Sequence, residues 1–378
     1  MPTSPAPRLV AAARRYKKMG WLPAHLVTPD KVPKDARLPL RYLLPYYATS
    51  KIIWKLYGKS PISSDLAWDV KSSWNNAFPP PLSEWGTPTS DASFVRLRLQ
   101  GPNPFMLARS TPDPDMGDGD DWVVFDLDFS RLFDGVFVPT IARFLLVDDE
   151  LVPAWISIDG ELHRPNSDRW EDAKRIVNGL DARYSAFVRH LLNTHLMVGQ
   201  AYALAGHTLP VWHPLRPFMD FFTYATLHVN HIAFGALLTE DSYFLRSNFV
   251  SADDAHRLIV NATAEFNFDE WLAPTDIENR GIDAIPNHPY VEDSRLVWPL
   301  IERIVADHLG DIDINADADV TNDQHLIAWY TTLRSVLPGV ESVPVLTGTD
   351  DLKNLMTALI YNNVIHEICG DFSPILGS

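Results

Sequence analysis

The stretch 168–205 constrains the fold of this chain more than any other part of the sequence, because it predicts one long, largely buried helix. Apolar residues recur there at helical spacing, and Asp168 stands where an N-cap is expected. The interior of the stretch, RHLLNTHLM, holds His190 and His195. On a regular α-helix, residues five apart point roughly 140° away from each other, whereas histidines that converge on one metal ion are four apart. The pair is therefore either two ordinary core histidines or two ligands on a locally deformed helix.

The composition is that of a folded protein with a sizeable core. Of the 378 residues, 46% are hydrophobic, which excludes a disordered or fibrous chain. The length allows one large helical domain or two to three smaller ones. The formal net charge of −16 argues against a nucleic-acid partner, because phosphate binding needs clustered cations. The longest apolar stretch, 196–206, is too short to span a bilayer, so we expect no transmembrane segment.

Two features bear on the location of the protein. Cys369 is the only cysteine, so no intrachain disulfide can form, and we expect a reducing compartment, the cytoplasm. Residues 1–29 contain arginines and lysines but no acid. This composition resembles an organelle transit peptide, and the alternative is an amphipathic helix with a solvated basic face.

The organisation of the chain changes near residue 165. Residues 20–120 are punctuated by prolines and predict loops with short helices, and the acidic stretch 116–121 predicts a solvated turn. Residues 122–129 and 144–160 are rich in β-branched and aromatic residues, which predicts two or three short strands, including a hairpin. We expect a proline-rich part with short strands, 1–165, and a helical part, 166–378, within one structural domain.

Further helices are predicted in the second half, which makes the fold class mainly α with a small β region. The helical ranges are 218–238, 293–309, 322–336 and 350–369, and residues 266–292 are expected to be a long surface connection. The last helix has Thr349 or Asp350 as its cap, carries His366 and ends at Gly370.

The three histidines on the two apolar helices allow two interpretations. A buried neutral imidazole with a satisfied hydrogen bond is the commonest fate of any one of them. Neutral imidazole is also the commonest biological metal ligand, and three imidazoles suit iron, manganese or zinc.

The central stretch, WEDAKRIVNGLDARYSAFVRHLLNTHLMVGQAYALAGHTLPVWHPLRPFM, resembles the central helices of the lipoxygenases. That family has five histidines separated by four, four, seventeen and eight residues, and with the same spacing this chain has Ser185, His190, His195, His213 and Phe222. Three more segments are similar to the family: RLRLQGPNPFML, PTIARFLLVDDELVPAWISI and LMTALIYNNVIHEICGDF.

The resemblance implies a catalytic metal centre. His190, His195 and His366 match the family's three histidine ligands, and a π-type turn lets the first two converge. Ser185 and Phe222 replace histidines that are not ligands in the family. The implied metal is iron, with manganese as the alternative.

Two departures concern the remaining ligands. Gly370 stands where the family has a weak Asn or His ligand, and the sequence ends at Ser378, before the long segment that supplies the family's terminal carboxylate. The site then uses three histidines and water, or another acid replaces the carboxylate. Asp371 is the first candidate for that acid, and a solvated helix end is the alternative interpretation.

The resemblance also implies a substrate channel. Residues 227–244 resemble the family's arched helix, which places Ala233, Leu237 and Phe244 against the substrate. Leu191, next to His190, is expected in the same channel. By periodicity alone, all four are core residues.

Three functions remain open from the sequence. The first is a dioxygenase that removes hydrogen from an unsaturated fatty-acid-like or polyene chain and adds O2. The second is a metal-dependent cyclase, isomerase or cleavage enzyme of an unsaturated metabolite. The third is a metal-free lipid-binding protein. The sequence does not indicate an oligomeric state.

Overall fold

A computed structural model gives the fold of the chain. It describes residues 90–238, 248–337 and 341–365, together with positions 16–18, 27–29, 32, 37, 39, 41, 242, 244, 245 and 339. The chain divides into two compact units, each assembled from separate stretches. The helical unit comprises Met1–Ile62, His190–Phe268 and Leu300–Glu367, and the sheet unit comprises Ser63–Arg189, Asp269–Pro299 and Ile368–Ser378. The sequence predicted two consecutive parts of one structural domain, 1–165 and 166–378, and this division stays a prediction.

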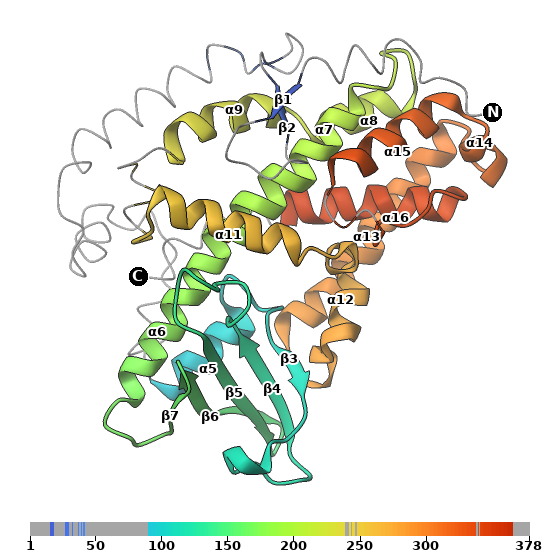
Figure 1. Cartoon of the computed structure of the whole chain (residues 1–378). Helices are drawn as coiled ribbons and strands as arrows, with labels where there is room; N and C mark the ends of the chain where they lie inside the picture. Colours follow the sequence, from blue (N-terminus) through green and yellow to red (C-terminus); the bar gives the residue numbers. More distant parts are fainter. Residues whose placement is uncertain are drawn as a thin grey trace. The chain divides into compact units, whose positions relative to one another are not determined.

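The sheet unit is built on five antiparallel strands that pair in chain order (Figure 1). They are β3 (Ala108–Ser110), β4 (Val123–Asp128), β5 (Thr140–Val147), β6 (Glu150–Ile158) and β7 (Glu161–His163). The predicted hairpin is confirmed, since β5 and β6 pair across Asp148 and Asp149, whose φ angles are 49° and 66°. Positive φ at both turn residues matches the twist of a tight hairpin, and aspartate tolerates this conformation.

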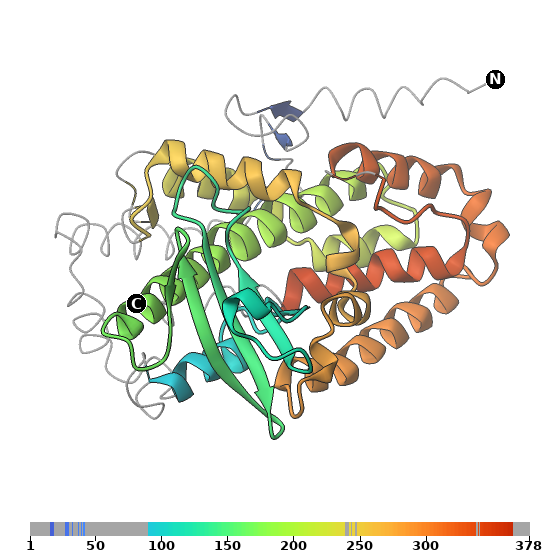
Figure 2. The same cartoon turned by 60° about the horizontal axis from the view of Figure 1, so that its bottom comes forward.

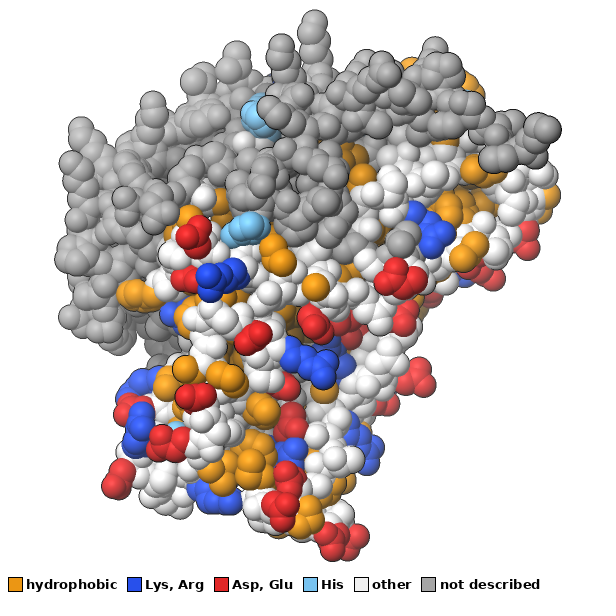
Figure 3. All heavy atoms as spheres, in the orientation of Figure 1, with side chains coloured by type: hydrophobic (Ala, Val, Ile, Leu, Met, Phe, Trp, Pro, Cys, Tyr) orange, Lys and Arg blue, Asp and Glu red, His pale blue; other side chains and the backbone are white. Residues whose placement is uncertain are grey.

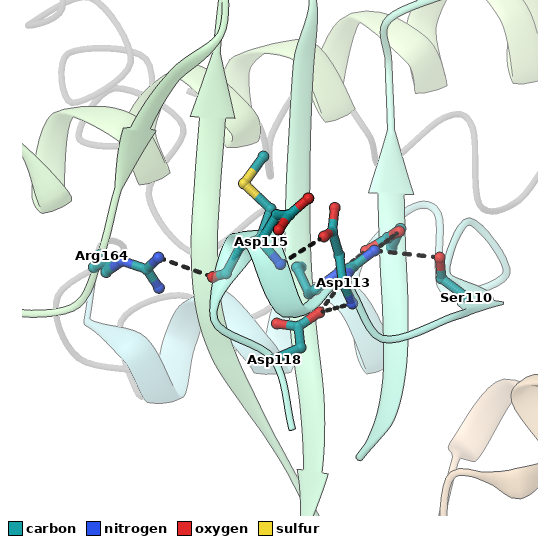
Figure 4. A network of polar contacts seen from close by, with 8 residues as sticks. Ser110, Asp113, Asp115, Asp118 and Arg164 are labelled. Carbon is teal, nitrogen blue, oxygen red and sulfur yellow. Dashed lines mark hydrogen bonds and ion pairs between the residues drawn. The ribbon is translucent and has the colours of Figure 1, made fainter. Parts of the chain in front are cut away.

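A polar network surrounds Arg143 on β5. Figure 4 labels five residues of this network: Ser110, Asp113, Asp115, Asp118 and Arg164. Its guanidinium donates to both carboxylate oxygens of Asp126, at 2.8 and 2.7 Å, and to Asp118. Asp118 also accepts from the amide of Asp113 at 2.8 Å, and Arg164 donates to a carbonyl of the same loop. The hydrogen bonds to Asp126 and Asp118 raise the pKa of Arg143. The acidic stretch 116–121, predicted to be solvated, is thus anchored to the sheet by the buried Asp118.

Two helices pack against β5 and β6, as both cartoon views show (Figures 1 and 2). They are α5 (Asp91–Gln100) and α6 (Trp170–Arg183). The ring of Phe94 on α5 stacks on that of Phe144 at 5.4 Å. Arg98 on α5 and Asp181 on α6 form a buried ion pair at 3.0 Å, so the two helices are joined by charge as well as by apolar contact. Acidic, basic and hydrophobic side chains are interspersed over the strands on the face drawn in Figure 3.

The long helix predicted at 168–205 is present, and its middle is a π-helix. It runs through α6, the π-helix η2 (Tyr184–Gly199) and α7 (Gln200–Gly206). Asp168 does not cap it, and this prediction was wrong. The first helical residue is Trp170, whose amide donates to the Ser167 carbonyl in a preceding turn, so Arg169 occupies the N-cap position.

The helical unit surrounds α7 with α8, α9 and α15. Its helices are α8 (Leu215–Phe222), α9 (Thr226–Leu237), α11 (Ala252–Ala264), α14 (Asp317–Thr321), α15 (Gln324–Val336), α16 (Thr349–Ile360) and the π-helix η5 (Tyr361–Ile365). Near the N-terminus, β1 (Tyr16–Lys18) pairs with β2 (Val27–Pro29). On α7, the hydroxyl of Tyr202 donates to the Leu355 carbonyl of α16 at 2.6 Å, which ties these two helices together.

The remaining elements correct several predicted bounds. They are α12 (Ala273–Arg280), α13 (Pro289–Asp311) and the short 3-10 turns η1 (Pro114–Met116), η3 (Phe268–Trp271) and η4 (Ile282–Ala284). The supposed surface connection at 266–292 therefore contains helices. The predicted helix 218–238 is divided between α8 and α9, because Ala225 has a left-handed φ of 60°. The cap of α16 is Gly348, not Thr349 or Asp350. None of the described helices is long and apolar enough to cross a membrane.

Candidate metal centre

The π-helix η2 brings the two histidines of the long helix together. Its hydrogen bonds join residues five apart, so side chains with that spacing lie on the same side of the helix. The Nε2 atoms of His190 and His195 are 3.0 Å apart, and their ring centroids are 4.8 Å apart. Histidines five apart would point away from each other on an α-helix, but on this π-helix they face each other.

The separation of the two nitrogens fits two ligands of one ion. Imidazole nitrogens bind first-row metals at about 2.0–2.1 Å, so two of them at a right angle around one ion lie about 3 Å apart. Both histidines are half-buried, and their neighbours Leu191, Leu192 and Met197 are buried and apolar. The two nitrogens therefore lie close together in largely apolar surroundings.

The third predicted ligand lies just beyond the last described residue. The last described part of the helix that leads to it is a second π-helix, η5, which lies immediately before His366 in the sequence. On η5, Asn363 donates to the carbonyl of Phe222 at the end of α8. His366, Gly370 and Asp371 lie outside the described residues, so their roles stay predictions. Within the part of the chain that the structure describes, three or more His, Cys, Asp or Glu side chains do not gather around one point.

The backbone at Gly199 shows how closely the surrounding elements approach the end of η2. A Cβ there would lie 2.7 Å from Thr226 Cγ2 on α9 and 3.1 Å from Asn363 Oδ1 on η5. It would also lie 3.0 Å from the carbonyl oxygen of Thr194. Glycine therefore allows η2, α9 and η5 to meet.

His213 has a different environment from the two converging histidines. Its Nδ1 accepts from the Leu215 amide at 3.2 Å, and its Nε2 faces Asp323 Oδ2 at 3.0 Å. Because Nδ1 accepts the hydrogen bond from Leu215, it carries no proton. The ring proton is therefore on Nε2, which donates to the Asp323 carboxylate. Burial alone would raise the pKa of Asp323, but the hydrogen bonds from His213 and the α15 amides hold it below its ordinary value. His213 is thus a buried structural histidine that joins the chain before α8 to the start of α15.

The residues expected along a substrate channel are only partly described. Ala233 lies on α9, and the structure does not describe its side chain. Leu237 at the end of α9 and Phe244 after it are half-buried, whereas Leu191 is buried. Their roles in a channel stay predictions.

Asn230 is a buried polar residue on α9 that contacts the backbone of His195, and it was not predicted from the sequence. The available signal was an asparagine within an apolar helix, since a buried amide requires hydrogen-bond partners.

Comparisons with known proteins identify relatives of this site and fold. The lipoxygenase family model matches residues 160–368. The human polyunsaturated fatty acid lipoxygenase ALOX15B is 30% identical over 174 residues, which is 45% of this chain and 25% of the human protein. The linoleate 9/13-lipoxygenase of Pseudomonas aeruginosa is 29% identical over 197 residues, which is 51% of this chain and 28% of the bacterial protein. The human hydroperoxide isomerase ALOXE3 is 28% identical over 240 residues, which is 60% of this chain and 34% of that protein.

The fold has relatives among solved structures. The crystal structure of coral 8R-lipoxygenase matches with a TM-score of 0.80 at 18% identity, over 97% of this chain and 63% of the coral chain. The predicted fold class, mainly α and similar to lipoxygenases with a small sheet in the N-terminal half, is confirmed. The chain spans between 25% and 34% of the length of these curated relatives.

Proposed function

The chain belongs to the lipoxygenase family, and from this membership we propose that it is a non-haem iron dioxygenase of unsaturated fatty-acid-like or polyene chains. The observation that best supports the proposal is the 3.0 Å separation of the His190 and His195 nitrogens on a π-helix. Manganese is the alternative metal. The single cysteine, Cys369, leads us to propose a reducing, cytoplasmic location as well.

The proposal assigns a role to each of the site residues. His190, His195 and His366 would hold the iron, with Asp371 as a further candidate ligand. Bound iron would supply the oxidation that removes hydrogen from a doubly allylic carbon, and O2 would add at one end of the resulting pentadienyl radical, which leaves a conjugated diene. The π-helix orients the first two imidazoles, and the buried Leu191 beside them helps to exclude water. Ala233, Leu237 and Phe244 would contact the apolar chain of the substrate.

Hydroperoxide rearrangement is a second candidate function. The hydroperoxide isomerase ALOXE3 matches 60% of this chain, a larger share than the 45% matched by ALOX15B. Gly370 also stands where the resemblance implies an Asn or His ligand, so the ligand set differs from that of the family at this position. A changed ligand set alters the reactivity of a bound metal.

The metal is tested by elemental analysis of purified protein before and after reconstitution. We expect about one iron or manganese per chain. His195→Ala should lose the metal and stay folded, whereas Ser185→Ala, which changes a buried non-ligand on the same helix, should keep it. Folded protein without either metal, even after reconstitution, would leave metal-free lipid binding as the function to test.

The chemistry is tested by incubating iron-loaded protein with polyunsaturated acids, polyenes and fatty-acid hydroperoxides. O2 uptake, conjugated-diene absorbance and product mass are followed together. A product heavier by two oxygen atoms supports the dioxygenase. A hydroperoxide converted without O2 to a product of unchanged mass supports the isomerase instead.

A further inference from the structure

A second contact reaches His195 through its backbone rather than its ring. Asn230 on α9 donates Nδ2–H to the His195 carbonyl oxygen at 2.7 Å and to Gln200 Oε1 at 2.9 Å. A carbonyl oxygen only accepts hydrogen bonds, so the Asn230 atom that faces it must be the amide nitrogen. Asn230 is 1% exposed, so water does not compete for this contact.

The contact lies where the long helix changes its hydrogen-bond register. The π-helix η2 ends at Gly199, and α7 begins at Gln200. Hydrogen bonds join residues five apart in a π-helix and four apart in an α-helix, so the backbone hydrogen-bond pattern changes between Gly199 and Gln200. Asn230 provides a donor to His195 on the π side and binds Gln200 on the α side.

We propose that Asn230 is a positioning residue that holds the His195 ring toward His190 by fixing the backbone at this junction. The inference rests on the proposed function in so far as it treats His195 as a metal ligand. The Oδ1 atom of Asn230 is buried and has no hydrogen-bond partner among the described residues, so burying this amide is costly, and only the two Nδ2 bonds offset that cost. A leucine would fill the same space without that cost and without the two bonds. The geometry therefore gives Asn230 a role beyond filling space.

A matched pair of variants separates positioning from general stability. Asn230→Leu removes the donor to the His195 carbonyl. Asn103→Leu removes a donor of the same kind, since buried Asn103 donates Nδ2–H to the Asp181 carbonyl on α6 at 2.8 Å. Both variants lose a buried amide that binds the long helix, but only Asn230 binds it next to a predicted ligand. Asn230→Ser, whose side chain is too short to span the same distance, replaces the first variant if that variant does not fold.

The first measurement is Co²⁺ binding to metal-free protein, followed by the visible absorption of the bound ion. We expect Asn230→Leu to weaken Co²⁺ binding by about 10- to 100-fold, the usual effect of losing a partner of a ligand residue, and to change the band shape. Asn103→Leu should keep the wild-type affinity and spectrum despite its lower stability. Equal Co²⁺ affinity in Asn230→Leu and wild type would overturn the proposal.

The second measurement needs no metal, so it tests the positioning role of Asn230 separately from the proposed metal-dependent function. Hydrogen exchange of the metal-free protein should be faster by about tenfold or more at 195–206 in Asn230→Leu, since the register change is no longer held. Exchange in α16 should not change. If wild type binds no Co²⁺, the proposed function fails, and the exchange result alone decides the positioning role. Unchanged exchange at 195–206 would then overturn it.

Discussion

The carboxylate of Asp323 illustrates how much one side chain determines in this fold. It caps α15 by accepting from the His325 and Leu326 amides at 2.7 and 3.1 Å, and it accepts from buried His213 at 3.0 Å. Asp323→Ala should remove the cap, worth about 0.5–2 kcal/mol, and leave His213 without its acceptor, at about 1–3 kcal/mol. Urea denaturation at pH 7 should show the combined loss. Ser251→Ala is the control, because it removes the cap of α11 and an exposed hydrogen bond to Asp254 but no contact with a buried histidine.

The same substitution has a pH dependence whose sign follows from the lowered pKa of Asp323. A carboxyl whose pKa is lower in the folded state contributes its full stability above its unfolded value, about 3.9. That contribution is lost as the pH falls through the folded pKa. The difference between wild type and Asp323→Ala should therefore be constant from pH 7 to about pH 5 and decrease below about pH 4. A difference that grows on acidification would contradict this assignment.

At the level of elements, hydrophobic periodicity predicted the long helix, α13, α15 and α16, and β-branched runs predicted the β5–β6 hairpin. Periodicity could not predict the π-helix, because η2 is buried on almost every side and its apolar residues therefore show no clear period. The π-type turn followed only from the resemblance. The break between α8 and α9 was also missed, because alanine at a left-handed φ gives no local signal at Ala225. The contact of Asn230 with His195 joins residues from two helices and cannot be seen in either stretch alone.

At Gly199, η2 packs closely against α9 and η5, so we predict that a larger residue there destabilises the fold. Gly199→Ala would place a methyl group 2.7 Å from Thr226 Cγ2 and 3.0 Å from a backbone oxygen, so the elements must move apart. We expect a loss of about 1–3 kcal/mol from overpacking and weaker Co²⁺ binding. The matched control is Gly206→Ala in α7, where the nearest atom is 3.8 Å away. It should be neutral or stabilising by about 0.4–1 kcal/mol, because alanine restricts the unfolded chain. Equal effects of the two changes in thermal unfolding would argue against close packing at Gly199.

At the level of the whole molecule, the three predicted histidine ligands belong to one unit. His190 and His195 begin the stretch His190–Phe268 of the helical unit, and α16 and η5 lie in its stretch Leu300–Glu367. The five-stranded sheet belongs to the other unit. Bound metal would therefore link distant stretches of the helical unit, and its stabilising effect should be found there.

This linkage predicts where and how strongly metal should stabilise the protein. A ligand that binds only the folded state adds about 2.7 kcal/mol when its free concentration is one hundred times its Kd. Co²⁺ at that concentration should raise the midpoint of thermal unfolding, and hydrogen exchange should slow in α7, α9 and α16 more than in β4, β5 and β6. His195→Ala should abolish both effects, because one of the two nitrogens that lie 3.0 Å apart is removed. Ser185→Ala should retain them. Slower exchange in the strands alone would place the metal in the sheet unit and refute the assignment of His190 and His195.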